Sequence, residues 1–261
     1  MKCIITGGGN TLIGEERFNG KAALYEQFRP GYPLSFFKEL ITQLVKKKDP
    51  IIADIGAGTG IFTNVLSNIS QKLIAVEPND EMRDILKRNF SNGCLCIKGQ
   101  AENTGLSNNS VDLITVAQAF HWFDPIAFGE ECKRILKKNG LVMLIWNSRE
   151  QESNLNRETA RISKKYCSSF QGFSGGINIE KLELPSFFTS GYERYSFSNP
   201  LKLTKEQFIG RNLSASYAPK KEDASYDGFV EELSDLYETN SSSEHFIIVP
   251  NDVHVFVGTI D

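Results

Sequence analysis

The sequence predicts an α/β protein whose mostly parallel sheet is covered by helices on both faces. Two observations indicate this fold class. Between residues 51 and 146, short apolar runs alternate with helical segments, which is typical of a parallel sheet built from βαβ units. The first of these runs leads into a glycine-rich turn, the usual start of a nucleotide-binding βαβ unit. With 261 residues, the chain is also long enough to bury a full core.

The individual elements follow from periodicity and from turn residues. Strands are expected at the apolar runs, and helices where apolar residues recur at helical spacing between them. The predicted strands lie at 51–54, 72–77, 94–98, 111–117 and 141–146, with later ones at 195–203 and 254–260. The predicted helices lie at 21–28, 34–47, about 61–70, 80–90, 126–138, 151–169, 204–213 and 225–238. The helix at 126–138 should be capped by Asp124 and Pro125 and should stop at Gly140.

The regularity fades after residue 147, which divides the chain into three regions. We expect an N-terminal extension at residues 1–20 and a ligand-binding core at 21–150. The C-terminal half, 151–261, should contribute the final strands and a cap of helices over the binding site.

Composition argues against several classes of function. The net charge of −3 and the absence of a basic stripe argue against a protein that neutralises a nucleic-acid backbone. The five cysteines do not form paired metal-ligand motifs, so no metal is expected, and reduced thiols in the cytoplasm fit best. No apolar stretch approaches the roughly 20 residues of a membrane helix, and the N-terminus lacks a signal-peptide pattern.

Two glycine clusters compete for the role of the nucleotide-binding turn. The first, Gly7 to Gly9, is followed by a segment that Gly20 and Pro30 interrupt, and no strand ending in an acid comes after it. An edge strand or an N-terminal extension is the expected role of that cluster. The second cluster, at 56–60, is followed by a helix and then by a strand that ends at Glu77. The second cluster is therefore the predicted ligand site.

The chemistry of the second turn selects a particular ligand. Glu77 lies 23 residues after Asp54, at the tip of the next strand, where a carboxylate can accept hydrogen bonds from both ribose hydroxyls. The glycines at 56, 58 and 60 depart from the G-x-G-x-x-G spacing of dinucleotide sites. Asp54 is a poor neighbour for a diphosphate and a good one for an ammonium group. A nucleoside with a cationic amino-acid tail, S-adenosylmethionine, fits these features best.

These motifs together resemble those of class I S-adenosylmethionine-dependent methyltransferases. The resemblance covers about residues 20–150 and rests on D-x-G-x-G-x-G, the acid after strand two and GQAE at 99–102. The stretches at 25–33, 117–123 and 213–219 resemble the small-molecule branch that includes trans-aconitate methyltransferase-like proteins. The family implies a Rossmann-like fold with a mostly parallel seven-stranded sheet, helices on both faces and a helical cap. Gln100 departs from the pattern, because many relatives have aspartate there.

The resemblance also implies residues that bind the cofactor. Asp54 would hold the ammonium group, Glu77 the ribose, and the backbone of Ala101 the adenine edge. Gln100 could bond the adenine as well, with Glu102 as a weaker alternative, whereas Met82 fits either the adenine or the core. The complete set is Asp54, Gly56, Ala57, Gly58, Glu77, Pro78, Met82, Gln100, Ala101, Glu102 and Gln118.

A second set of residues is expected at the reacting groups. His121, Tyr25 and Arg29 are the predicted catalytic residues, and the acceptor would contact Trp122, Tyr32, Arg211 and Tyr217. His121 would act as a base only toward a phenol, hydroxyl or amine, since a carboxylate is already ionised at neutral pH.

The sequence thus favours a cytoplasmic methyltransferase acting on a small molecule, with a carboxylate oxygen as the expected acceptor atom. Two alternatives stay open. A nucleic-acid methyltransferase would often show an N/D-P-P-Y/F element after strand four, where this chain has A-Q-A-F-H-W. A protein that binds S-adenosylmethionine without turnover would have the same glycine turn. The sequence predicts neither the identity of the acceptor nor the oligomeric state.

Overall fold

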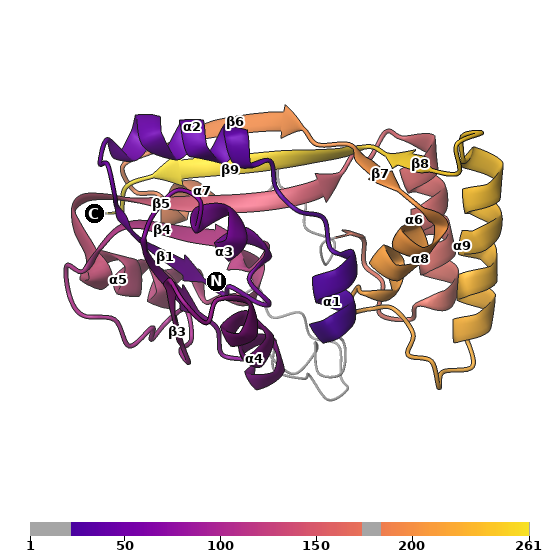
Figure 1. Cartoon of the computed structure of the whole chain (residues 1–261), viewed down its shortest axis with the longest axis horizontal. Coiled ribbons are helices and arrows are strands. Elements are labelled where there is room, and N and C mark those ends of the chain that lie inside the picture. Colours follow the sequence, from indigo (N-terminus) through magenta and orange to yellow (C-terminus); the bar gives the residue numbers. More distant parts are fainter. Residues whose placement is uncertain (1–21, 174–183, 261) are drawn as a thin grey trace.

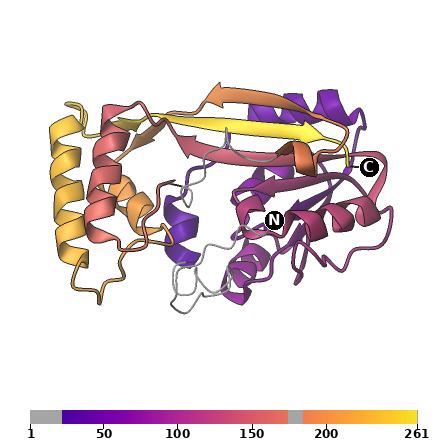
Figure 2. The same cartoon turned by 180° about the vertical axis from the view of Figure 1, so that it is seen from behind.

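The computed structural model describes residues 22–173 and 184–260, without the side chains of residues 23–25. The expected extension at residues 1–20, with Gly7 to Gly9, therefore lies outside the described residues. Figure 1 shows a large sheet at one end of the molecule and a group of helices at the other end. The reverse view in Figure 2 shows the same two parts, with helix α1 (Ala22–Phe28) between them.

The main sheet has seven strands in the order β3-β2-β1-β4-β5-β9-β6. Only β9 runs antiparallel, and it does so to both of its neighbours, β5 and β6. This arrangement confirms the predicted fold class, including the number of strands. The bounds are β1 Ile51–Ile55, β2 Lys72–Val76, β3 Cys94–Ile97, β4 Val111–Ala117, β5 Leu136–Arg149, β6 Tyr192–Ser198 and β9 Asn251–Gly258.

Helices pack on both faces of the sheet because its central strands are apolar on both sides. On one face, Ile52 packs in a cluster with Phe37 of α2 (Leu34–Val45) and Leu66 of α3 (Ile61–Leu66). The next residue, Ala53, points to the opposite face, as successive strand residues do. It joins a cluster there that contains Phe128 of α5 (Pro125–Ile135) and residues of the short helix α7 (Leu184–Phe187).

Helix α5 begins where the sequence predicted and ends earlier. The Asp124 carboxylate accepts hydrogen bonds from the backbone N–H groups of residues 126 and 127 at 3.0 and 3.1 Å, with Pro125 at the first position. The prediction that the helix runs to residue 138 was wrong. Leu136 has an extended backbone and pairs with Val111, so the chain enters β5 at once, and Gly140 is a strand residue rather than a helix stop.

The second part of the molecule has a hydrophobic core of its own. Its helices are α6 (Asn154–Tyr166), α8 (Lys205–Leu213) and α9 (Tyr226–Asn240), with the strand pair β7 (Leu201–Leu203) and β8 (Ile247–Val249). Phe208, Phe229 and Leu233 are completely or almost completely buried in this core. The sequence did not predict β8. We call this group of elements the cap, and Figure 1 shows β5 and β9 reaching from the sheet toward it.

Helix α1 packs closely against the cap. A methyl group added at Gly210 of α8 would lie 2.5 Å from the ring of Phe28, so only glycine permits this approach. Among the residues that the structure describes, no helix is long and apolar enough to cross a membrane, and no cluster of potential metal ligands occurs.

Candidate functional site

A pocket that is partly open to solvent lies between the sheet and the cap. It sits at the carboxyl ends of β1, β4 and β5, where α/β proteins bind their ligands. Eleven of the predicted site residues line it: Arg29, Tyr32, Asp54, Gly56, Ala57, Gly58, Gln118, His121, Trp122, Arg211 and Tyr217. The structure thus brings together residues that are far apart in the sequence. The backbone of Tyr25 belongs to α1, and its side chain lies outside the described part of the chain.

The glycine turn forms one wall of the pocket. Gly56 and Gly58 have φ angles of 69° and 60°, which glycine adopts far more readily than other residues. Among the residues that the structure describes, a Cβ atom at Gly58 would meet only the Met82 sulfur within 4 Å, at 3.8 Å. A Cβ at Gly56 would instead lie 2.7 Å from the Cβ of Ala119. Gly58 therefore leaves open space above the turn, and Gly56 is packed against the protein.

Asp54 is buried at the end of β1, and two threonines hold its carboxylate. Thr63 Oγ1 donates to one carboxylate oxygen at 2.6 Å and Thr115 Oγ1 donates to the other at 2.9 Å. Burial raises the pKa of Asp54 to about 6, and these two hydrogen bonds partly oppose the effect. The carboxylate is thus oriented and largely ionised at neutral pH.

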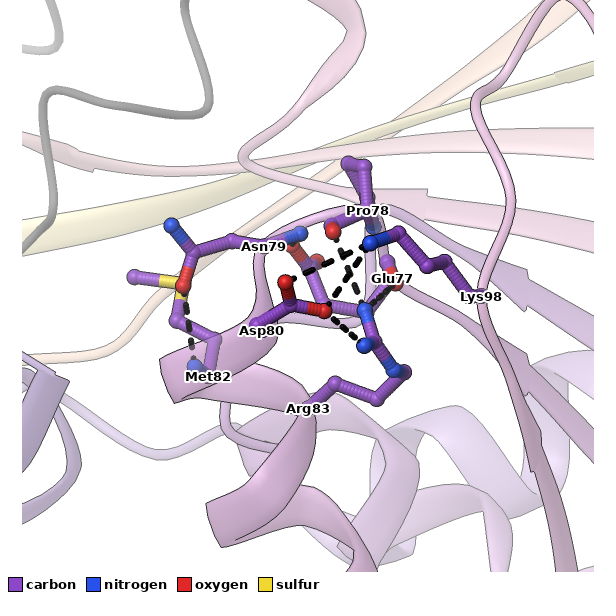
Figure 3. Close-up of polar contacts among 7 residues, drawn as sticks. All are labelled: Glu77, Pro78, Asn79, Asp80, Met82, Arg83 and Lys98. Atoms are coloured by element: carbon purple, nitrogen blue, oxygen red, sulfur yellow. Dashed lines mark hydrogen bonds and ion pairs between the residues drawn. The ribbon is translucent and has the colours of Figure 1, made fainter.

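Glu77 lies beneath the glycine turn at the end of β2. Its carboxylate accepts hydrogen bonds from the backbone N–H groups of Gly58 at 2.8 Å and Asn79 at 2.9 Å. Burial raises the pKa of Glu77 to about 7. Figure 3 shows Arg83 of α4 (Asp80–Asn89) donating to the main-chain oxygens of Glu77 and Pro78. These contacts fix the strand end that carries the carboxylate.

Glu77, Pro78 and the remaining residues predicted for the cofactor are not among the residues that line the pocket. Met82 is buried beside Gly58, and Ala101 is also buried. Gln100 is exposed and forms an isolated bridge with Asn103. The Glu102 carboxylate accepts a hydrogen bond from the backbone N–H of Asp124 at 2.8 Å. Of these side chains, only Met82 lies beside the glycine turn, whereas Ala101 packs in the cluster that contains Phe128 of α5.

His121 and Gln118 follow β4 and face the pocket. Gln118 has a φ of 59° and donates through Nε2 to the main-chain oxygen of Asn147 at 2.5 Å. His121 belongs to a short 3₁₀ helix, Phe120–Trp122, and its buried Nδ1 has no hydrogen-bond partner among the described residues. Burial, together with the nearby positive charge of Arg29, lowers the pKa of His121 to about 4. The imidazole is therefore neutral at physiological pH.

Three arginines line the same pocket, one from each of three parts of the chain. Arg29 comes from the segment after α1, Arg149 from the end of β5 and Arg211 from α8. Burial lowers the pKa of Arg149 to about 10 and also lowers the pKa of Arg211, and the positive charge of Arg29 adds to both shifts. Asp54 is the only acidic residue among the described residues that line the pocket. The site is thus strongly cationic.

Sequence analysis missed several of these residues. Thr63 and Thr115 gave no signal, because Thr63 is separated from Asp54 by the glycine turn and Thr115 lies 61 residues away in the chain. Arg149 and Asn147 could have been found, because they end a strand of the parallel sheet and such ends face the ligand crevice.

Comparisons with known proteins identify the family. Residues 53–144, from the strand before the glycine turn to β5, match the model of a methyltransferase domain. An uncharacterized methyltransferase-like protein of Schizosaccharomyces pombe is 30% identical over 212 residues, which cover 81% of this chain and 82% of the relative. The chain belongs to the class I S-adenosylmethionine-dependent methyltransferases. An uncharacterized methyltransferase of Mycobacterium bovis is 32% identical to it over 77% of this chain and 76% of its own length.

Solved structures agree with the fold of this methyltransferase. A type II methyltransferase candidate from Anaeromyxobacter dehalogenans superposes with a TM-score of 0.69 at 18% identity, covering 89% of this chain and 98% of its own. The YcgJ protein of Bacillus subtilis gives a TM-score of 0.53 at 18% identity over 85% of this chain and 97% of its own. The matched domain contains Asp54, Glu77 and His121, whereas Arg149 and Arg211 of the methyltransferase lie beyond it.

Proposed function

We propose that this methyltransferase transfers the methyl group of S-adenosylmethionine to a carboxylate oxygen of a small molecule. The observation that carries the proposal is the cationic pocket, whose described lining contains three arginines and a single carboxylate that two threonines already hydrogen-bond. Guanidinium groups bind carboxylates through parallel hydrogen bonds. A small acid would bring the negative charge that the described pocket residues do not supply.

The residues of the glycine turn fit the cofactor. The open space at Gly58 would admit its ribose and methionine portions, and Glu77 lies next to that space to accept the ribose hydroxyls. Asp54, oriented by its two threonines, would face the ammonium group. Met82 and the backbone of Ala101 would flank the adenine. When bound, the cofactor supplies a methyl group on a positively charged sulfur.

The chain's own residues would then orient the acceptor and exclude water. Trp122 and Phe62 contribute aromatic surface to the pocket, and a dry site favours a reaction in which charge disappears. The arginines would hold the acceptor carboxylate in line with the methyl group, so that proximity supplies most of the acceleration. A carboxylate has no proton to lose, and a neutral His121 would serve as a hydrogen-bonding group rather than as a base.

The proposal predicts that small carboxylic acids become methyl esters. Purified protein would be incubated with S-adenosylmethionine carrying a labelled methyl group and with separate panels of small acids, phenols, amines and oligonucleotides. We expect label in an acid product that is released by mild alkali, with S-adenosylhomocysteine formed in equal amount. Transfer only to a phenol, an amine or an oligonucleotide would contradict the proposal, as would binding of the cofactor without transfer to any acid.

The role of His121 has a separate test. The variant His121→Asn should keep kcat within about tenfold of the native value at saturating cofactor, because loss of a true general base typically costs 10²- to 10⁴-fold. The kcat of both proteins should be measured between pH 6 and 9 with the acid that serves as acceptor. A drop of 100-fold or more throughout this pH range would instead make His121 a base.

A further inference from the structure

We infer that Asn251 and Asn212 are positioning residues of this methyltransferase, each of which holds one pocket arginine that belongs to the other part of the molecule. Neither asparagine is among the site residues that the sequence predicted. The inference goes beyond the proposed function, because it concerns how the pocket arginines are held and not which acceptor they bind.

The two contacts cross between the sheet and the cap. Arg149 ends β5 of the sheet, and its Nη2 donates to Oδ1 of Asn212 in α8 of the cap at 2.8 Å. Arg211, the residue before Asn212 in α8, donates through Nη2 to Oδ1 of Asn251 in β9 at 2.8 Å. Within the sheet, Asn251 is the direct strand partner of Arg149. Two adjacent cap residues are thus joined to two adjacent sheet residues, and each pair contributes one arginine and one asparagine.

Both asparagine amides are buried, and their donor ends are paired as well. Asn212 and Asn251 are each 1% exposed. The Nδ2 of Asn212 donates to the main-chain oxygen of Phe208 at 2.8 Å, and the Nδ2 of Asn251 donates to the side chain of Asn147. A buried amide whose two ends are both paired cannot turn over without losing hydrogen bonds. The oxygen that each amide presents to its arginine is therefore fixed.

An amide holds a guanidinium group without neutralising it. In the described parts of the chain, neither Arg149 nor Arg211 forms an ion pair with an acidic residue, and Nη1 of each is buried without a hydrogen-bond partner. Both arginines line the pocket. Each is thus anchored by one terminal nitrogen and keeps its charge and a second donor for a ligand. A carboxylate in place of either amide would hold the arginine but would cancel its charge.

Methyl transfer is sensitive to this kind of positioning. The acceptor atom must lie in line with the methyl carbon and the sulfur, and a displacement of about 1 Å can cost about 100-fold in rate. Asn251 fixes Arg211, a residue of the cap, to the sheet that also carries the glycine turn. Asn212 ties Arg149 of the sheet to the cap in return. The two asparagines thus set the position of both guanidinium groups relative to the cofactor site.

The arginine side chains report on this positioning without any acceptor. In protein with isotope-labelled arginine, NMR measures how fast the terminal N–H protons exchange with water, and Arg149→Lys and Arg211→Lys assign the two signals. In Asn251→Leu, we expect exchange at Arg211 to accelerate about tenfold or more, as for loss of one hydrogen bond from a charged group, and exchange at Arg149 to stay within about threefold. Asn212→Leu should give the opposite result.

Two further variants separate positioning from a general loss of stability. Asn251→Asp keeps an oxygen that accepts from Arg211, so exchange at Arg211 should remain slow. Leu233→Ala removes a fully buried side chain from the cap core and leaves both asparagines in place. It should lower the Tm and keep both exchange rates within about twofold of the native values, at a temperature where every variant is folded.

Kinetic measurements give a second, independent readout. The acceptor would be whichever compound receives most label in the panels described above, whatever its chemical class. In Asn251→Leu, the KM for that acceptor should rise about tenfold, while the calorimetric dissociation constant of S-adenosylmethionine stays within about twofold, because the glycine turn is unchanged. Leu233→Ala should keep the native values of both constants.

Two outcomes would overturn the inference. Native exchange at Arg211 in Asn251→Leu would show that the amide does not hold the arginine. Equal acceleration at both arginines in both leucine variants would show that the asparagines support the cap as a whole. An acceptor other than a carboxylic acid would contradict the proposed carboxylate transfer, and so would the absence of any acceptor. In either case the exchange rates would still decide the role of the asparagines.

Discussion

Replacing Glu77 by glutamine is expected to weaken binding of S-adenosylmethionine about 100-fold. The amide keeps the size of the side chain and one oxygen that can accept the Gly58 N–H, so the fold should persist. It loses the charged oxygens that would accept the ribose hydroxyls, and hydrogen bonds to charged groups contribute about 1.5–3 kcal/mol each. Calorimetric titration of both proteins at pH 8 would measure the change.

The pH dependence of the same titration provides the control. Because the pKa of Glu77 is raised to about 7, the native carboxylate takes up a proton as the pH falls through neutrality, and cofactor affinity should fall with it. The glutamine variant should show no change until Asp54 titrates near pH 6. Glu130→Gln, which alters an exposed glutamate of α5, should behave as the native protein does. Native affinity in Glu77→Gln would disprove the assigned role.

Alanine at Gly56 is expected to lower the free energy of unfolding by about 3 kcal/mol. The φ of 69° costs a residue with a Cβ roughly 1–2 kcal/mol. The new methyl group would also lie 2.7 Å from the Cβ of Ala119, and such overpacking costs about 1–3 kcal/mol more. For a protein of this size, thermal unfolding without cofactor should show a Tm lower by about 6–12 °C.

Alanine at Gly58 is the matched comparison, two residues further along the same turn. Its φ of 60° imposes similar strain, but the added methyl group enters open space. The Tm should therefore fall by only about 2–4 °C, for roughly 1 kcal/mol of strain. Cofactor affinity should fall by more than tenfold, since the methyl group occupies the ligand's position. Equal Tm losses in the two variants, with cofactor binding unchanged in Gly58→Ala, would refute the different roles of these glycines.

The sequence correctly predicted those parts of the molecule whose structure depends on residues close to one another in the chain. The alternation of strands and helices, the glycine turn and the position of Glu77 all depend on spacing within a few dozen residues. The predicted end of helix α5 was wrong because Lys137 and Lys138 suit a helix. The pairing of Leu136 with Val111 instead places these two lysines in strand β5. Here tertiary pairing overrides local propensity.

The contacts within the site depended on information that one sequence does not contain. Thr115 reaches Asp54 because β1 and β4 pair in that register, and 61 residues separate the two in the chain. The pairing of Arg211 with Asn251 likewise joins the cap to the sheet across 40 residues. The sequence could suggest single residues of the cap, such as Arg211 and Tyr217, as binding residues. That they line the same pocket as the glycine turn could be seen only from the folded structure.

The length of β5 has a consequence for the choice of acceptor. The same continuous strand packs in the sheet core at Met143 and Ile145 and ends in the pocket at Arg149. The span from the glycine turn to that guanidinium group is thus set by hydrogen-bonded backbone rather than by closure of a hinge. Under the proposed function, this fixed span would limit the length of the acid that fits between the glycine turn and Arg149.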